Sequence, residues 1–292
     1  MANLKEIRTR IVSVTNTRQV TSAMKMVSAA KLRKSQDAIV KIKPYSDKML
    51  EIIESVGKSL TGNFSSPLFK PNQTGNTLVI LITSNKGLCG VFNTTITRMA
   101  IDWVKNKRHE ELKNKQVVFF TIGKKGYDIV SKLGFEIIGR EDNLVNKPSF
   151  DFSSFFTKTL LQKYKDGEYR EIIIFYNSFK NVATQLPTME TFLPISIDHQ
   201  SNKANTLQYI LEPNPQVIIE ELTPKMLETS MHKMILDSVA SEHGARMTAM
   251  HKATDNASEL IDTLKLNYNK ARQYNITNEI LEIVSGANAL KG

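Results

Sequence analysis

Apolar residues near the end of the chain recur with alternating steps of three and four. The clearest run is Met250, Ala253, Ala257, Leu260 and Leu264. An average step of about 3.5 residues is the spacing of a left-handed coiled coil. Asn214 and Pro215 suit the N-cap and the first position of a helix. The pattern therefore predicts one long helix over 214–292, whose apolar stripe needs a partner.

The far end of this predicted helix continues the stripe less regularly. The apolar positions drift through Tyr268 and Ala271 and are expected to resume at Ile276, Ile280 and Ile283. At 1.5 Å per residue, the helix would be roughly 110 Å long. A helix of this length is expected to be the main structural element, against which the rest of the chain is arranged.

The first 60 residues carry a matching pattern. Steps of three and four link two sets of apolar residues: Leu4, Ile7, Ile11 and Val14, then Ile42, Tyr45, Met49, Ile52 and Val56. Between these sets, Val20, Met24 and Val27 are expected to continue the stripe after a shift in register. Pro44 should kink the helix without ending it, because the stripe continues on both sides.

These two ends of the chain are predicted to pair as an antiparallel coiled coil. The alternative is that both are ordinary amphipathic helices of one globular core. Helices of globular domains rarely exceed 25 residues without caps, which favours the coiled coil.

The middle of the chain changes period. Three short runs rich in β-branched and aromatic residues read as buried strands: Leu78–Thr83, Val117–Ile122 and Ile172–Tyr176. Helical patterns lie between them, near 91–107, 124–133 and 151–166. The stretch Val182–Ile195 contains Pro187 and predicts an edge or hairpin strand. Alternating strands and helices indicate a mostly parallel α/β sheet.

The predicted fold is therefore α/β with long helices, an antiparallel coiled coil carrying an inserted Rossmann-like α/β domain. The segments are 1–60 for the N-terminal helix, 61–213 for the inserted domain with its linkers, and 214–292 for the C-terminal helix. The linkers are placed at 61–76 and 198–206, which are rich in Gly, Pro, Asn and Ser.

Composition limits the class of protein. No apolar run approaches the 18 residues of a membrane span, and the first ten residues lack the apolar core of a secretory signal. A soluble intracellular protein is expected, with any membrane link made through partners. The single cysteine, Cys89, excludes an intrachain disulfide and a cysteine-based metal site.

The net charge of +10 is concentrated at the N-terminus. Residues 1–34 hold eight basic side chains against one acidic, whereas 214–292 hold eight basic against ten acidic. Opposite signs suit two helices that pair, and the basic surplus indicates an acidic surface nearby. Nucleic acid is the rival partner, but the basic residues are interleaved with seam positions and few aromatic residues accompany them.

The turn Ser84–Gly90 follows the first predicted strand and precedes a helix, where nucleotide-binding loops lie. It lacks both glycine-rich phosphate motifs, so a tight structural turn at Gly87, Cys89 and Gly90 is preferred to a phosphate site. Cys89 as a nucleophile is the alternative to a small buried thiol. The five histidines have no metal-ligand spacing. No catalytic residue, metal site or cofactor is predicted.

Several motifs resemble the gamma subunit of the F-type ATP synthase of bacteria. They lie in both predicted helices and in the central turn: Ile7-Arg8-x-Arg10-Ile11 and Ala23-Met24-Lys25-Met26-Val27, Gly87-Leu88-Cys89-Gly90, Ala240–Met250, Tyr268–Gln273 and Ile276–Ala287. Between 100 and 210, only the strand and helix order matches. Asn85 and Lys86 stand where the family commonly has an acidic residue and an arginine. Asn278, between Thr277 and Glu279, is a further small departure.

The resemblance implies a non-catalytic rotor shaft. It implies a coiled coil inside a hexamer of alpha and beta subunits, and an α/β domain beside the epsilon subunit and the c ring. It also implies a peripheral location on the cytoplasmic face of the bacterial inner membrane, with no nucleic acid bound. By resemblance, these residues contact the hexamer: Met24, Lys25, Arg246, Arg272, Gln273, Thr277, Glu279 and Glu282.

Two other classes stay open on the residues alone. One is a coiled-coil tether or adaptor whose α/β domain binds a different partner. The other is a small-molecule enzyme with a helical arm. Co-purification separates them, because only the rotor requires ATPase alpha and beta subunits in one complex.

Overall fold

The computed structural model describes residues 4–59, 67–182, 184–195, 212 and 214–289. Its contacts divide the chain into two compact units, Met1–Ser28 with Met247–Gly292, and Ala29–Arg246. We call them the helical unit and the mixed unit. The two long helices, α1 (Leu4–Ser59) and α7 (Pro215–Ala289), contribute to both. The predicted linker at 198–206 lies outside the described residues, as do residues 61–66 of the other.

The helix α7 begins where the sequence predicts. The Asn214 side chain caps it, with Oδ1 accepting from Val217 N at 2.9 Å, and Pro215 is the first helical residue. The helix then continues through Pro224 for 75 residues, about 110 Å at 1.5 Å per residue. Helix α1 likewise continues through Pro44.

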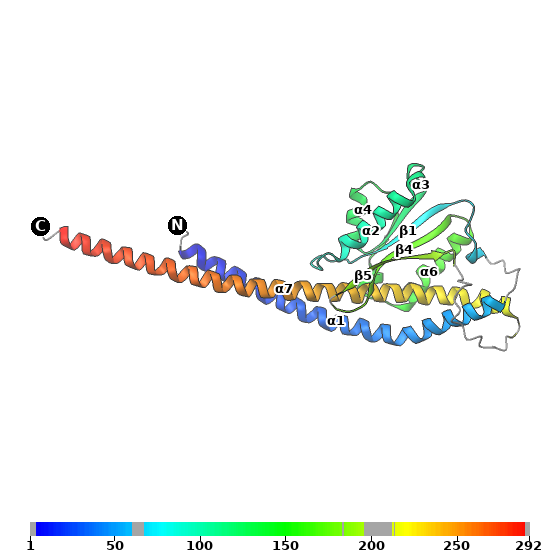
Figure 1. Ribbon diagram of the computed structural model, residues 1–292, viewed down its shortest axis with the longest axis horizontal. Helices are drawn as coiled ribbons and strands as arrows, with labels where there is room; N and C mark the ends of the chain where they lie inside the picture. Colours follow the sequence, from blue (N-terminus) through cyan, green and yellow to red (C-terminus); the bar gives the residue numbers. More distant parts are fainter. Residues whose placement is uncertain (1–3, 60–66, 183, 196–211, 213, 290–292) are drawn as a thin grey trace. The chain divides into compact units, whose positions relative to one another are not determined.

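The helices α1 and α7 pack together as an antiparallel pair (Figure 1). Within the helical unit, Thr254 Oγ1 donates to Thr21 Oγ1 at 2.9 Å, and Ile7 lines the same groove as Leu264 and Ala271. Residues earlier in α1 thus meet residues later in α7. Within the mixed unit, Lys233 Nζ lies 3.7 Å from Asp47 Oδ1, which continues the same order.

The inward face of α1 keeps one register over its full length. Buried and half-buried residues recur with strict steps of four and three: Ile7, Ile11, Val14, Arg18, Thr21, Lys25, Ser28, Leu32, Ser35, Ile39, Ile42, Ser46, Met49, Ile53 and Val56. The predicted register shift is therefore wrong. Val20 and Val27 are 58% and 57% exposed, and Ser46 and Ile53 take the places expected for Tyr45 and Ile52.

Small hydroxyl side chains explain why the seam was misread. Thr21, Ser28 and Ser35 occupy seam positions although they are polar. Their hydroxyls donate to carbonyl oxygens of their own helix, as in Ser28 Oγ to Met24 O at 2.8 Å. A hydroxyl satisfied in this way can be buried without an unpaired polar atom. A pattern based on apolar residues alone misses such positions.

The seam of α7 differs from the prediction at two places. Ile261 is buried where Leu260 was expected, and the seam residues Met250, Ala257 and Leu264 are confirmed as buried. The expected resumption at Ile276, Ile280 and Ile283 is wrong, because all three side chains are exposed. Helix α1 begins at Leu4 and shares a groove with α7 as far as Asn275, so the last turns of α7 continue past it (Figure 1).

The mixed unit contains a five-stranded sheet of order β3-β2-β1-β4-β5. The strands are β1 (Asn76–Ile82), β2 (Val117–Ile122), β3 (Ile137–Glu141), β4 (Tyr169–Phe179) and β5 (Gln185–Leu193). All neighbours are parallel except β4 and β5. This confirms the mostly parallel sheet and the edge strand that contains Pro187, and the structure shows that this strand runs antiparallel to β4.

The remaining helices of the mixed unit connect the strands. They are α2 (Phe92–Lys107), α3 (His109–Lys113), α4 (Lys124–Lys132), α5 (Asn143–Asn146) and α6 (Phe150–Lys165), with a 3-10 turn, η1, at Pro67–Phe69. The sequence pattern missed β3, whose burial alternates and whose residues include Gly139, Arg140 and Glu141. It also missed the short helices α3 and α5.

Two hydrophobic clusters make this unit a three-layer structure. Val79, Phe119 and Phe175 face α2 and α4 on one side of the sheet. On the other side, Ile80 and Ile174 face α6, α7 and the Met49–Ile53 turn of α1. Between Met226 and Arg246, α7 is buried on nearly every side, and its buried residues include the charged Glu228, Glu242 and Arg246. This segment belongs to the helical layer that also contains α6 and part of α1.

The corrected register of α1 predicts that substitutions at two adjacent residues change stability by unequal amounts. Ser28→Leu places three extra carbon atoms in a closely packed seam, which should lower the free energy of unfolding by about 1–3 kcal/mol. Val27→Leu changes an exposed side chain and should shift it by less than about 0.5 kcal/mol. Urea unfolding of the purified chain measures both. A larger loss for Val27→Leu than for Ser28→Leu would contradict this register.

Candidate functional site

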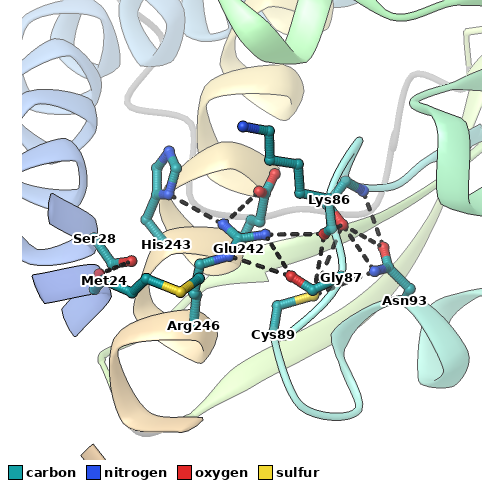
Figure 2. Close-up of polar contacts among 10 residues, drawn as sticks. Met24, Ser28, Lys86, Gly87, Cys89, Asn93, Glu242, His243 and Arg246 are labelled. Carbon is teal, nitrogen blue, oxygen red and sulfur yellow. Dashed lines mark hydrogen bonds and ion pairs between the residues drawn. The ribbon is translucent and has the colours of Figure 1, made fainter. Parts of the chain in front are cut away.

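The turn between β1 and α2 covers a buried thiol. Asn93, in the first turn of α2, accepts from Ser84 N at 2.9 Å and donates to Ser84 Oγ at 2.8 Å (Figure 2). Its side-chain amide also lies 3.2 Å from Cys89 Sγ. Gly87, Cys89 and Gly90 all lie in this turn, and Gly90 has a left-handed φ of 61°. The turn is closed by its own polar groups.

The amides at the start of α4 are all bound within the chain. Lys124 N donates to Asn85 Oδ1 at 2.9 Å, and Gly126 N donates to Thr83 Oγ1 at 2.8 Å. Lys125 N donates to Ser84 O at 3.0 Å. A phosphate bound at this helix start would have to displace these bonds. The phosphate site weighed from the sequence lies instead before α2, where Phe92 N donates to Cys89 O at 3.3 Å.

The backbone approaches itself closely where β1 and β2 end, beside this turn. Gly123 has a φ of 102°, and a Cβ built there would lie 2.2 Å from Thr83 O. No side chain fits without moving the backbone of β1. Gly123 therefore brings the carboxyl ends of β1 and β2 together, which places Asn85 and Thr83 over α4.

The titratable groups near the turn are poorly suited to catalysis. Burial raises the pKa of the Cys89 thiol, an effect that the Ser84 hydroxyl and Arg246 only oppose. Burial, Arg246 and Lys31 lower the pKa of His243 to about 4, so its ring is neutral at pH 7. Across the described residues, no three His, Cys, Asp or Glu side chains could hold a metal ion together.

The outer face of α1 in the helical unit carries an exposed apolar patch. It consists of Val20, Ala23, Met26 and Val27, and all four side chains are exposed. A groove of about 430 Å³ runs beside it, lined by Arg18, Ala23, Met26 and by Thr254 of α7. Met24 and Lys25, adjacent in sequence to the patch, are half-buried. An apolar patch with basic neighbours is typical of a protein contact surface.

The second unpartnered surface is the end of α7, Arg272–Ala289, which we call the free end. Its large apolar side chains are all exposed: Tyr274, Ile276, Ile280, Leu281, Ile283 and Val284. They lie on more than one side of the helix, because Leu281 and Val284 follow Ile280 and Ile283 by one residue, or about 100°. A solvated helix rarely has such a surface, so the free end is a strong candidate for a partner contact.

The predicted contact residues fall in three places. Arg272, Gln273, Thr277, Glu279 and Glu282 are exposed on the free end, and Met24 and Lys25 lie in α1. Arg246 differs, because it is only 7% exposed and binds Glu242 and the turn before α2. The sequence interpretation missed Glu242, although its spacing of four residues from Arg246 is that of a helical ion pair. It also missed Leu88 and Val91, both exposed in the turn.

Comparisons with known proteins agree over the full chain. The family model described as ATP synthase matches residues 3–290. The ATP synthase gamma chain of Flavobacterium psychrophilum is 51% identical over 292 residues, covering 100% of both chains. That of Cytophaga hutchinsonii is 42% identical, covering 99% of both.

Solved structures share the fold. One is a chain of the Euglena gracilis mitochondrial ATP synthase, from an OSCP/F1/c-ring structure in rotational state 3. It superposes with a TM-score of 0.68 at 19% identity, covering 98% of this chain and 94% of that one. A chain from the central stalk and c ring of Tetrahymena thermophila has a TM-score of 0.55 at 23% identity, covering 80% and 99%.

The burial of Cys89 predicts that its thiol is alkylated slowly in the folded chain. In the native chain at pH 8, alkylation of Cys89 by iodoacetamide should be at least about tenfold slower than in urea, because the thiol is covered and its pKa is raised. Mass spectrometry counts the alkylated sites. Lys165→Cys provides the control, since residue 165 is exposed on α6 and should be alkylated first. Equal rates at both thiols would contradict a closed turn.

Proposed function

This chain belongs to the ATP synthase gamma chain family, and we propose that it is the non-catalytic rotor of the central stalk. In this function, rotation of a proton-driven c ring is transmitted along α1 and α7 to the catalytic sites of an alpha/beta hexamer. The reverse direction couples ATP hydrolysis to proton pumping. The chain contributes mechanical coupling, and the chemistry takes place in other subunits.

The free end of α7 is the observation that carries this proposal. A single helix that exposes six large apolar side chains on several sides requires a partner that surrounds it. A ring of alpha and beta subunits provides such a sleeve. Ser285, Gly286 and Ala287 are small, which keeps the end of the helix narrow inside it.

The exposed patch on α1 supplies a second contact with the hexamer. Val20, Ala23, Met26 and Val27 offer apolar area, and Lys25 and Arg18 offer positive charge beside it. Exposed ion pairs contribute only about 0–1 kcal/mol each, so the apolar area should provide most of the affinity. The charges would orient the shaft against an acidic rim of the hexamer.

The α/β domain is proposed to hold the epsilon subunit and the c ring. A groove of about 530 Å³ beside α6 is lined by Phe152, Phe155 and Ile138, all exposed, and offers apolar area for a protein contact. None of the helices in the described residues is long and apolar enough to cross a membrane. We place the chain at the cytoplasmic face of the bacterial inner membrane, held there through the c ring.

Two rival functions have less support. A small-molecule enzyme needs a catalytic group, whereas the thiol of the turn before α2 is buried and has a raised pKa. A tether with another partner would need neither a narrow free end nor the family's full-length match. Co-purification with ATPase alpha and beta subunits tests the proposal against both, and their absence from a native pull-down would count against the rotor.

The first expected outcome concerns the isolated chain. Purified without partners, it should hydrolyse no ATP above buffer, because the described residues hold no catalytic constellation. A phosphate-release assay measures this, with the reconstituted alpha–beta–gamma complex as the positive control. If the isolated chain hydrolysed ATP and a Lys86→Ala variant lost this activity, the result would support the alternative that the chain is an enzyme.

The second expected outcome concerns Arg272 and Gln273 on the free end. Arg272→Ala combined with Gln273→Ala should leave the thermal melt of the chain unchanged, since both side chains are exposed. The same pair should lower ATP synthesis and hydrolysis of the assembled complex several-fold, because a hydrogen bond to a charged group contributes about 1.5–3 kcal/mol.

Lys132→Ala is the matched control for that pair. It removes one exposed cation from α4, far along the chain from the free end, and should alter neither the melt nor turnover. Full turnover by the double variant would exclude the contact at Arg272 and Gln273. A collapsed melt would show that one of these side chains supports the coil.

A further inference from the structure

The groove of about 530 Å³ beside α6 extends across the sheet. It is lined by Glu141, at the end of β3, and by Asn76 and Tyr169, at the starts of β1 and β4. Because these strands run parallel, the residues lie at opposite edges of the sheet, about 17 Å apart along the strand direction. Small-molecule sites in proteins have volumes of roughly 300–1,000 Å³. The groove therefore has the volume and the length of a ligand site.

A bulge in β3 brings an acidic side chain into this groove. Ile138 has no partner in the pairing of β3 with β2, so β3 has one extra residue at this point. Ile137, before the bulge, packs on the α4 side of the sheet. Glu141, after it, pairs with Ile122, which belongs to the cluster on the α6 side. In a regular strand Ile137 and Glu141 would share a face, so the bulge is what turns Glu141 toward α6.

Gly139 makes room for an aromatic floor. A Cβ built at Gly139 would lie 2.5 Å from Cε2 of Phe120, so a side chain there would displace the ring. A glycine inside a strand marks such close approaches. The Phe120 ring also packs against Phe156 of α6, with ring centroids 5.0 Å apart. These two rings form the base of the groove, and the exposed Phe152 and Phe155 form its rim.

The carboxylate of Glu141 has no cation beside it. Its Oε1 accepts a hydrogen bond from Asn143 N at 2.8 Å, and none of the described residues forms an ion pair with it. Arg140, the neighbouring cation, is turned away from the groove. Its guanidinium donates to Asp142 Oδ2 at 2.7 Å and lies over the ring of Tyr127 on α4. Glu141 Oε2 is therefore available to a ligand.

The basic side chain of the groove is already paired. Lys163 Nζ lies 2.9 Å from Glu168 Oε2 and 5.9 Å from the centroid of the Tyr169 ring. With Lys163 and Glu168 offsetting each other, the net charge of the lining is that of Glu141. Aromatic faces attract cations through the ring quadrupole, and a carboxylate attracts them directly. The charge and the rings thus favour the same kind of ligand.

We propose that this groove binds an organic cation with a flat apolar body. The body lies on Phe120 between the rims of α6 and β3, and an ammonium group donates to Glu141 Oε2. Glu141 keeps its bond to Asn143 N when the ligand is bound. This site is additional to the rotor function and does not depend on it. The outer faces of Phe152 and Phe155 remain available for the protein contact at the rim.

Equilibrium dialysis of the purified full chain with two fluorescent probes tests the charge preference. Naphthylethylammonium and naphthylpropionate have the same flat body and opposite charges. The cation should bind at a single site, about tenfold or more tightly than the anion, because a charge-assisted hydrogen bond to Glu141 forms only with the cation. Equal affinity for the two probes, or tighter binding of the anion, would overturn the proposal.

Glu141→Gln locates the charged end of the site. The substitution keeps an oxygen that can accept from Asn143 N but removes the negative charge. Affinity for the cation should fall about tenfold, and affinity for the anion should not fall. Glu136→Gln is the matched control, because Glu136 is exposed just before β3 and does not line the groove. Unchanged cation binding in Glu141→Gln, or an equal loss in Glu136→Gln, would contradict the site.

Gly139→Ala tests the floor. Its added methyl group displaces the Phe120 ring, so both probes should bind several-fold more weakly. Gly286→Ala is the control, since no atom lies within 4 Å of a Cβ built there. Phe152→Ala removes an exposed ring and should weaken both probes without affecting the thermal melt, so the result does not rest on Gly139→Ala folding. Full affinity in Phe152→Ala would place the probes elsewhere and overturn the proposal.

Discussion

The 4–3 alternation of buried positions along α1 is the constraint on which the rest of the structure depends. A solitary helix of 56 residues would expose its whole inward stripe to water, and most helical stability in proteins comes from packing such a stripe. Because every seam position of α1 keeps the same register, α7 can follow it without a break. The hydroxyl residues Thr21, Ser28 and Ser35 keep that register with small side chains that bond to their own helix.

Helix α7 has a different environment in each part of its length. Between Met226 and Arg246 it is a buried layer of the mixed unit, packed against the sheet, α6 and α1. From Met250 to Ala271 it presents a single seam to α1. Tyr274 and Asn275 still line a groove with Ile7 and Arg10 of α1, and from Glu279 to Asn288 every side chain is exposed. The Glu242–Arg246 pair lies at the end of the buried part, where it fastens a surface turn to a helix that cannot easily move.

Much of this architecture follows from the sequence, and the exceptions have physical causes. The runs Leu78–Thr83, Val117–Ile122 and Ile172–Tyr176 predicted the three central strands because a strand buried on both faces is continuously apolar. The edge strand β3 has no such run and was missed. The seam was misplaced at Val20 and Val27, since a hydroxyl that bonds to its own backbone is invisible to a search for apolar residues.

The candidate site, too, could be predicted from the sequence only in part. The tight turn at Gly87, Cys89 and Gly90 could be anticipated from its glycines and from its place after a strand. The bonding of Arg246 to the carbonyls of Lys86 and Gly87 could not, because it joins backbone atoms to a side chain about 160 residues away. Exposure of the free end was also unpredictable from periodicity, since Ile276, Ile280 and Ile283 have the spacing of a buried seam.

The central claim is that this chain turns inside a ring of catalytic subunits. Single-molecule observation of the alpha–beta–gamma complex tests it most directly, with the hexamer fixed to a surface and a bead attached through Lys165→Cys on α6. Because Cys89 is buried, labelling of this chain should be confined to the introduced thiol. The account predicts sustained rotation of the bead in one direction when ATP is added. A bead that stays still while the same complexes hydrolyse ATP would contradict it.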